Sequence, residues 1–309
     1  MGRKDLWQSD YFDDKERFAD MINGGLFKGE TVVKPEELLQ ADSGMVYHEK
    51  NGEAVSVIRD KVYKWKGKYI SICVLENQSY VDYRMVFRIM LEEAVSYIKQ
   101  QKKTFKKWKA AGYKFKGNEF LSQMRKEEKF IPVITLVLYL GKEAWDGAKS
   151  LYEMLEIDEG MKPFVTNYKI NLFDYHECKD FSGFRTENRF LFELLINSED
   201  KDKTEKIIKK YLNDYSLDEE TARVIFGMLE IKEDIDKYKK RTEKGERINM
   251  CKAWDDQRES GRREGKREGK HEALTENLKC IMKNLKVTIQ QAMDILEIPE
   301  EERSFYVSL

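Results

Sequence analysis

Hydrophobic positions in the first part of the chain switch between helical and strand spacing. Apolar residues recur at helical spacing over residues 10–26, and Asn23-Gly24-Gly25 predicts the end of this helix. Two extended runs follow, residues 54–63 and 69–75, and residues 65–68 between them predict a hairpin turn. The second run is almost wholly apolar, which predicts a strand at the centre of a sheet.

A long helix and a second apolar strand complete the predicted core. Residues 81–108 place apolar side chains at helical spacing and contain neither glycine nor proline, so they predict one long helix. Residues 119–129 predict a short polar helix, residues 130–140 a central strand, and residues 168–173 one more strand. This alternation of helix, strands, helix and strand predicts an α/β fold.

From residue 186 onward the pattern is helical. A four-residue pattern of Gly, two residues of Lys, Arg or His, and Glu repeats from Gly261, Gly265 and Gly269. Each glycine costs about 1 kcal/mol relative to alanine inside a helix, so the segment either gains from helix–helix contact in a homo-oligomer or is a flexible charged spacer. We expect an α/β domain over residues 1–185, a helical region packed on or following it over residues 186–245, and a charged helical tail with short terminal helices over residues 246–309.

Composition narrows the class of protein. The 309 residues include 56 basic and 57 acidic side chains, which gives a formal net charge of −1 and argues against a polycation that coats DNA. The longest apolar run, residues 130–140, is too short to span a bilayer, and the N-terminus shows no apolar signal segment. We therefore expect a cytoplasmic protein without a membrane span, in which the four scattered cysteines are reduced.

Several common chemistries are disfavoured by what the sequence lacks. It has three widely spaced histidines, no Cys-x-x-Cys pair, and no glycine-rich phosphate-binding loop. These absences argue against a His-rich zinc site, a Ser–His–Asp triad and a common nucleotide fold. Carboxylates with a hard cation are the remaining expectation for an enzyme.

Two acidic residues fall on apolar strand faces. Asp60 shares strand parity with its apolar neighbours two positions away, and Glu76 and Gln78 share parity with the buried positions of the preceding strand. Two carboxylates that converge at one sheet edge favour a divalent ion, since each raises the pKa of the other when no cation is present. The alternative is that Asp60 is an acid in a bent strand near a turn and that Glu76 caps the long helix.

The same residues carry a resemblance. Asp60, a fifteen-residue gap and Glu76-Asn77-Gln78 resemble the PD-(D/E)XK nuclease pattern, with Gln78 at the position that is most often Lys. Sequence blocks at residues 16–27, 76–85 and 131–141, together with the glycine-spaced tail, resemble the Rpn family of recombination-promoting nucleases, also labelled transposases. The resemblance covers about residues 10–270.

This resemblance implies a restriction-endonuclease-like core, a central mixed sheet flanked by helices, followed by an all-helical C-terminal region. It also implies Mg²⁺- or Mn²⁺-dependent DNA cleavage of low sequence specificity, linked to recombination or mobile elements. Asp60 and Glu76 would hold the metal with the carbonyl of Asn77, Gln78 would orient the attacking water, and Asp20 would be an auxiliary acid on the first helix.

A local basic segment supports a DNA partner. Residues 99–129 contain eleven basic and three acidic residues, a net charge of +8, interleaved with aromatic residues. The candidate contacts are Lys102, Lys103, Lys106, Lys107, Trp108, Lys109, Lys114 and Lys116. The alternative is a solvated helix end whose aromatic side chains pack on the domain. Two rival functions also stay open: a DNA-binding protein on a degenerate nuclease core, and an oligomeric scaffold built on the tail.

Overall fold

A computed structural model describes residues 10–41, 44–48, 54–58, 61–75, 81–211, 216–229, 231, 234–242 and 245–306 of the chain. They form two compact units, the first comprising residues 1–231 and 240–248 and the second residues 232–239 and 249–309. Among the described residues, no helix is long and apolar enough to cross a membrane.

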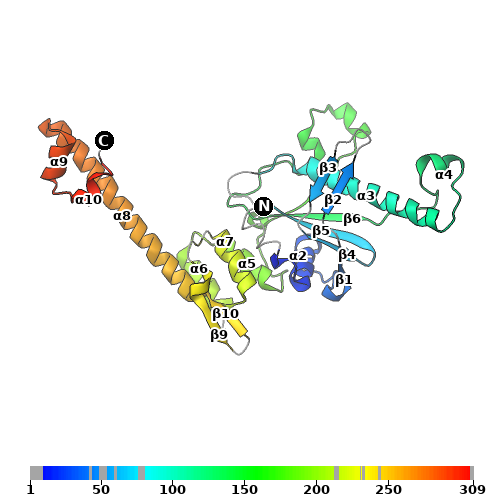
Figure 1. Cartoon of the computed structure of the whole chain (residues 1–309), viewed down its shortest axis with the longest axis horizontal. Helices are drawn as coiled ribbons and strands as arrows, with labels where there is room; N and C mark the ends of the chain where they lie inside the picture. The colour runs from blue at the N-terminus through cyan, green and yellow to red at the C-terminus, as the bar shows by residue number, and fades with distance from the viewer. Residues whose placement is uncertain are drawn as a thin grey trace. The chain divides into compact units, whose positions relative to one another are not determined.

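A five-stranded mixed sheet forms the centre of the first unit (Figure 1). Its strands, in spatial order, are β1 (Leu38–Gln40), β4 (Lys61–Trp65), β5 (Lys68–Leu75), β6 (Val133–Tyr139) and β7 (Asn171–Asp174). The first three strands pair antiparallel, whereas β5, β6 and β7 are parallel. The apolar runs predicted as central strands are therefore β5 and β6, and both have a neighbour on each side.

Two helices cover opposite faces of this sheet. Helix α3 (Met85–Ala110) packs on the face that carries Val137 and Tyr139 of β6. Helix α2 (Lys15–Phe27) packs on the other face, where Gly25 lies against Leu136. Since alternate residues of a strand point to opposite faces, β6 is covered from both sides. The prediction of a mixed α/β fold with a long second helix is confirmed.

The turn between β4 and β5 follows from its two residues. Lys66 has φ 44° and Gly67 has φ 79°, and Trp65 pairs with Lys68 across the turn. Two successive left-handed residues are the geometry of the two-residue hairpin whose twist matches that of the strands. The predicted hairpin turn is confirmed.

The extended run at residues 54–63 is not one strand. Its first half, β3 (Ala54–Ile58), pairs with β2 (Gly44–His48) in a separate two-stranded sheet. Its second half belongs to β4 in the central sheet. The prediction of a single strand is wrong, because alternation along a sequence reports extended backbone and does not report which strand is the partner. Ile58 and Val62, the two apolar neighbours on which the strand-parity argument for Asp60 depends, therefore belong to different sheets, and the argument no longer holds for Ile58.

The predicted end of the first helix at Asn23-Gly24-Gly25 is also wrong. Helix α2 continues to Phe27 and ends at Lys28, which adopts the left-handed conformation with φ 53°. A Cβ at Gly24 would lie 2.2 Å from the ring of Phe184, so this glycine permits close packing rather than a turn.

The C-terminal part of the first unit mixes helices with a small sheet. Helices α5 (Glu187–Ile196), α6 (Lys201–Tyr211) and α7 (Glu219–Met228) lie in the region where the sequence predicts a helical pattern. Strands β8 (Ser216–Leu217), β9 (Lys239–Thr242) and β10 (Gly245–Asn249) form a three-stranded sheet. The expectation of an all-helical region is corrected here, since β9 and β10 are short, largely exposed and polar strands without an apolar periodicity.

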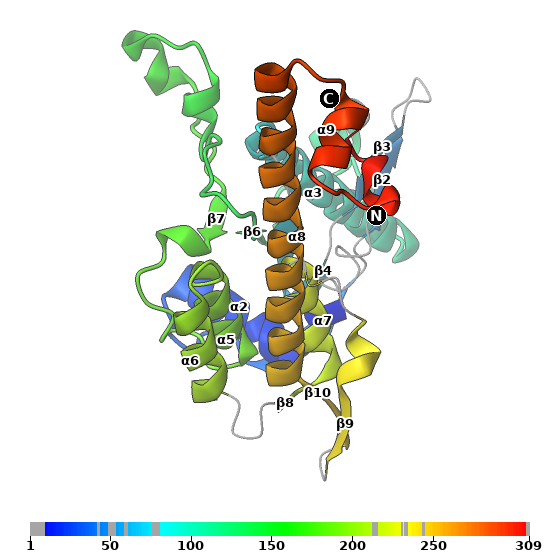
Figure 2. The ribbon, with the colours of Figure 1, turned by 90° about the vertical axis from the view of Figure 1, so that its left-hand side faces the viewer.

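The second unit is a helical hairpin. Helix α8 (Met250–Leu285) is followed by α9 (Ile289–Ile295) and α10 (Glu300–Arg303), which fold back on its C-terminal end (Figure 2). Leu278, Met293 and Tyr306 form its apolar centre. Thr288 caps α9 through a reciprocal capping box with Gln291. The three predicted tail glycines lie inside α8, and an added Cβ at any of them meets no atom within 4 Å.

Candidate functional site

The predicted catalytic residues Asp60, Glu76, Asn77 and Gln78 lie outside the described residues, but their neighbours are described. Lys61, the first residue of β4, pairs with Ile72 of β5. The last residues of β5, β6 and β7 lie side by side, since Leu75 pairs with Tyr139 and Tyr139 with Asp174. The chain therefore enters β4 and leaves β5 at one edge of the sheet, which we call the carboxyl edge.

A buried carboxylate organises the described part of the carboxyl edge. Asp174 accepts hydrogen bonds from the backbone nitrogens of Trp145 at 2.8 Å and His176 at 3.0 Å. Its Oδ1 also lies 2.7 Å from Nδ1 of His176, whose Nε2 lies 2.7 Å from the carbonyl oxygen of Lys142. These contacts tie together the loops that follow β6 and β7. Sequence patterns missed this pair, although an acid two residues before a histidine at a strand end is a visible signal.

No group of three His, Cys, Asp or Glu side chains that could hold a metal ion occurs within the part of the chain that the structure describes. The predicted donors are two carboxylates and a backbone carbonyl, at Asp60, Glu76 and Asn77. Such hard oxygen donors are those that Mg²⁺ prefers. By its chemistry the predicted donor set fits this ion.

Asp20, the predicted auxiliary acid, lies on α2 and is buried. Its carboxylate accepts hydrogen bonds from the backbone nitrogens of Arg185 (2.8 Å) and Thr186 (3.1 Å). It also accepts from the Thr186 hydroxyl at 2.6 Å and from Nδ2 of Asn188 at 3.0 Å. These four donors surround the first turn of α5, of which Thr186 is the N-cap. They account for the burial of Asp20 without a metal ion.

A second charged network ties α2 to α7. Arg17 forms ion pairs with Asp218 at 3.1 Å and Glu220 at 3.0 Å. Burial pushes the pKa of Asp218 upward, but hydrogen bonds from Thr221 and the charge of Arg17 outweigh it and hold that pKa below its ordinary value. Asp20 and Arg17 together fix α2 to the helices that follow the central sheet.

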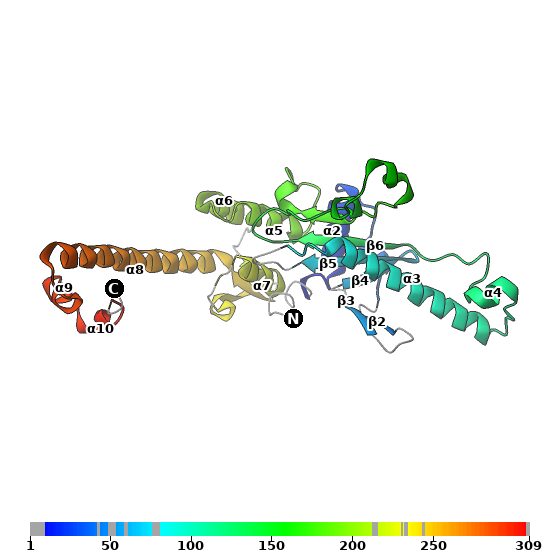
Figure 3. The same ribbon diagram turned by 90° about the horizontal axis from the view of Figure 1, so that it is seen from above.

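Helix α3 crosses the sheet and extends beyond it. Its N-terminal part packs near Tyr139, at the end of β6. Near the start of β6, Gln100 exchanges two hydrogen bonds with the backbone of Ile131, and the Tyr97 hydroxyl accepts from the nitrogen of Val133 at 3.1 Å. The remaining turns of α3 project past this end of the sheet and carry α4 (Gly117–Ser122) at their tip (Figures 1 and 3). We call residues 101–130 the distal lobe.

The predicted DNA-contacting lysines belong to the distal lobe, and all of them are exposed. Six of them form no ion pair with any residue that the structure describes: Lys103, Lys106, Lys107, Lys109, Lys114 and Lys116. With 3.6 residues per turn, positions 103 and 107 continue the stripe that carries Met85 and Ile89 over the sheet. Where the sheet ends, this stripe changes from apolar residues to lysine.

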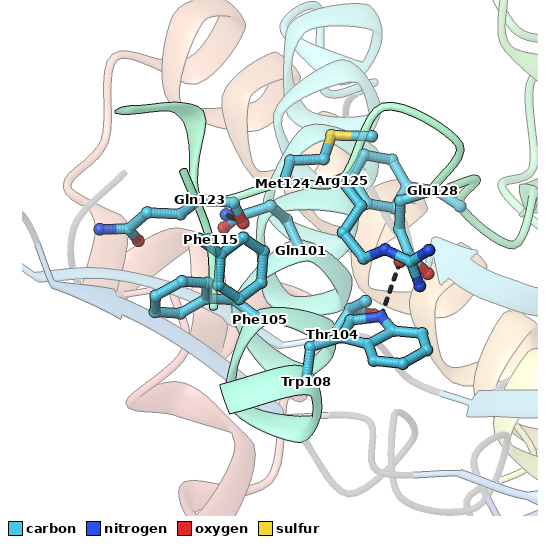
Figure 4. Close-up of a pocket in the computed structure, with 10 residues that line it drawn as sticks. Gln101, Thr104, Phe105, Trp108, Phe115, Gln123, Met124, Arg125 and Glu128 are labelled. Atoms are coloured by element: carbon cyan, nitrogen blue, oxygen red, sulfur yellow. Dashed lines mark hydrogen bonds between the residues drawn. The ribbon is translucent and has the colours of Figure 1, made fainter. Parts of the chain in front are cut away.

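The aromatic side chains of the distal lobe pack mainly on one another. The ring centroids of Phe105 and Phe115 lie 4.9 Å apart (Figure 4). Those of Trp108 and Tyr113 lie 5.9 Å apart. The Trp108 indole donates a hydrogen bond to Glu128 at 2.8 Å. This arrangement favours the alternative stated for these aromatics, that they pack within the fold, and it leaves Trp108 half-buried.

Arg125 closes the aromatic cluster of the lobe. Its guanidinium lies 4.2 Å from the ring centroid of Trp108 and 5.0 Å from that of Tyr113. Such cation–π contacts add to the packing of a small cluster. The distal lobe is therefore a small folded body rather than a frayed helix end.

The distal lobe lies beyond the opposite end of the sheet from the carboxyl edge. This separation arises because α3 runs antiparallel to β6, with its first turns near Tyr139 and its later turns near Val133. The seven residues of β6 span about 20 Å, and the projecting turns of α3 add about 15 Å. A duplex that contacted both regions would span on the order of one helical turn, about 34 Å.

The fold defines the class as a mixed α/β protein with helices on both faces of a central sheet and a helical hairpin at its C-terminus. A family model described as "Putative transposase, YhgA-like" matches residues 61–224, which is more than half of the chain. The chain belongs to this transposase family, and the family assignment made from the sequence blocks is confirmed. No curated protein and no solved structure matches the chain.

Proposed function

We propose that the chain is a Mg²⁺- or Mn²⁺-dependent endonuclease that hydrolyses phosphodiester bonds of DNA with low sequence specificity and serves a mobile element. The observation that carries the proposal is the family match over residues 61–224, which spans Glu76-Asn77-Gln78 and the distal lobe. Asp60 directly precedes the matched range. The order of α2, the antiparallel β4 and β5, α3 and the parallel β6 supports a restriction-endonuclease-like core.

The register supports the proposed site. Because β4 begins and β5 ends at the carboxyl edge, the positions next to them in sequence are joined to the same edge of the sheet. Asp60 and Glu76 would hold the ion together with the carbonyl of Asn77. When bound, Mg²⁺ would lower the pKa of a water molecule and stabilise charge on the phosphate. Gln78 would orient that water by hydrogen bonding, but it contributes no positive charge.

The test is cleavage of supercoiled plasmid by the purified full chain with Mg²⁺ or Mn²⁺. Glu76→Gln should reduce cleavage at least about 100-fold, since it removes a charge that acts on the reacting groups. Glu36→Gln is the matched control. Glu36 is an exposed glutamate just before β1, and Leu38 of β1 pairs with Trp65, at the opposite end of β4 from the carboxyl edge. The cleavage rate of this control should equal that of the wild type.

Two outcomes would contradict the proposal. Cleavage by the Glu76→Gln variant at the wild-type rate would refute the site. Salt-sensitive DNA binding without cleavage under any metal condition would favour the degenerate DNA-binding protein, for which Gln78 in place of Lys is the specific sequence signal.

A further inference from the structure

Two large apolar side chains at the tip of the distal lobe are exposed. Phe120 is 66% exposed and Leu121 is 80% exposed, and both belong to α4. They stand apart from the other aromatic residues of the lobe, which enclose one another. Exposed apolar side chains grouped on a polar surface commonly mark an interaction site, so we consider this pair a candidate binding surface.

The exposed pair is held by a fixed framework. Glu119, next to Phe120, accepts hydrogen bonds from the Tyr113 hydroxyl at 2.7 Å and from the backbone nitrogen of Lys126 at 3.2 Å. After α4, the carbonyl oxygen of Gln123 accepts a hydrogen bond from Gln101 of α3 at 2.8 Å. The tip is thus fastened to α3 and to the loop on both sides of the exposed pair.

Two of the three acidic residues of the lobe, Glu119 and Glu128, are engaged in hydrogen bonds within it, and the third, Glu127, is exposed and lies 3.9 Å from Arg125, so basic residues outnumber acidic ones on the surface of the lobe. The hydrogen bond from the Tyr113 hydroxyl, helped by that from Lys126, holds the pKa of Glu119 below its ordinary value. Glu128 is engaged with the Trp108 indole. Lys114, Lys116, Lys126 and Lys129 are exposed on the same lobe. This charge distribution is complementary to a polyanion.

Among polyanions, a nucleic-acid duplex fits better than an anionic membrane. Helices that bind in the membrane interface carry an extended apolar face, whereas α4 has six residues and the exposed pair is short. Phe and Leu are side chains that proteins insert between base steps, unstacking them, while basic residues hold the backbone. A rigid basic lobe with one exposed Phe-Leu pair has the composition that this mode of binding requires.

We propose that Phe120 and Leu121 form a wedge that enters the base stack of a DNA duplex whose backbone is held by the lysines of the distal lobe. The inference rests on the proposed function in taking DNA as the partner, but it does not depend on cleavage. The wedge would act on the order of one helical turn from the carboxyl edge and would kink the duplex there.

The experiment uses the full chain in EDTA, so that binding is measured without cleavage. The probe is a duplex of about 30 base pairs with 2-aminopurine at one base step, whose fluorescence rises on unstacking; affinity is measured by anisotropy at several salt concentrations. The test variant is Phe120→Ser with Leu121→Ser. The matched control is Met161→Ser with Phe164→Ser, an exposed apolar pair outside the lobe with 55% and 82% exposure.

The wild type and the matched control should both raise the fluorescence on binding. The Phe120→Ser, Leu121→Ser variant should lose this rise and bind about tenfold more weakly, which corresponds to about 1.4 kcal/mol. Its salt dependence should be unchanged, because the wedge carries no charge. Equal melting temperatures of the two double variants would show that the loss is not one of folding.

The outcomes separate this inference from the nuclease proposal. Wild-type binding without a fluorescence rise, or a rise retained by the Phe120→Ser, Leu121→Ser variant, overturns the wedge alone. A rise that depends on the pair in a chain that never cleaves DNA with Mg²⁺ supports the wedge and refutes the nuclease. Absence of duplex binding at low salt overturns the wedge, and so does wedge-dependent binding to phosphatidylserine vesicles in place of DNA; plasmid cleavage with Mg²⁺ by the same protein decides the nuclease proposal separately.

Discussion

Replacement of Asp20 by alanine tests whether this residue holds the fold together or takes part in catalysis. The substitution removes the acceptor for four hydrogen bonds, from two backbone nitrogens, the Thr186 hydroxyl and Asn188. Asn188 is fully buried, so its amide has little access to replacement water. A buried donor without an acceptor costs about 1–3 kcal/mol. Because some of the donors are only half-buried, we expect a total loss of about 2–4 kcal/mol in the free energy of unfolding.

The assay is urea unfolding of the full chain, followed by circular dichroism, for Asp20→Ala, Asp20→Asn and the exposed control Glu36→Ala. Asp20→Asn keeps one carbonyl oxygen and should lose about half as much as Asp20→Ala. The control should stay within about 0.5 kcal/mol of the wild type. An Asp20→Ala variant that unfolds like the wild type but no longer cleaves DNA would refute the structural account and would support Asp20 as the auxiliary acid.

Three further outcomes are expected. Gly24→Ala should destabilise the first unit by about 1–3 kcal/mol, since the new Cβ would lie 2.2 Å from the ring of Phe184. Gly261→Ala should instead stabilise α8 by about 0.5–1 kcal/mol, because the added atom meets nothing within 4 Å. Thermal unfolding checks both variants. The pKa of Asp218 is lowered in the folded state, so its contribution is full above the ordinary Asp pKa of about 3.9 and is lost as the pH falls through the lower folded value. The stability advantage of the wild type over Asp218→Asn should accordingly be constant above about pH 5 and shrink below about pH 4 in acid unfolding. Thr288→Ala should remove the cap of α9 and cost about 1 kcal/mol, which hydrogen exchange of the C-terminal hairpin measures.

The central sheet could be predicted because its signals are local. The apolar runs of β5 and β6 predict central strands, and the turn at Lys66-Gly67 depends only on the backbone conformation of these two residues. The split between β3 and β4 could not be predicted in this way, since it depends on which strand each half pairs with. The two glycines inside α2 gave a wrong prediction of the helix end for a related reason. The absence of a side chain at Gly24 leaves room for the ring of Phe184, which lies 160 positions further along the chain.

The candidate site was predictable only in part. Sequence spacing pointed to Asp60 and Glu76, which remain predictions outside the described residues. The family resemblance named Asp20 and the basic aromatic segment named Trp108, but no local pattern shows that Asp20 accepts hydrogen bonds from the start of α5 or that Trp108 donates to Glu128. Both contacts are long-range, so side-chain type alone cannot separate an acid or an indole that acts on a ligand from one that holds the fold.

The change of α3 from apolar to basic at the end of the sheet bears on the nature of the partner. A helical stripe that loses its packing surface must become polar, and Glu or Gln would satisfy that requirement as well as Lys, since all are good helix formers. Yet no acidic residue occurs between Glu93 and Glu119, while lysine fills every exposed charged position in between. Solubility alone favours mixed signs, because like charges one turn apart on a helix repel. Such one-sided charge is costly for the isolated helix, and the proposed binding of DNA would offset that cost, although the chain as a whole has a net charge of only −1.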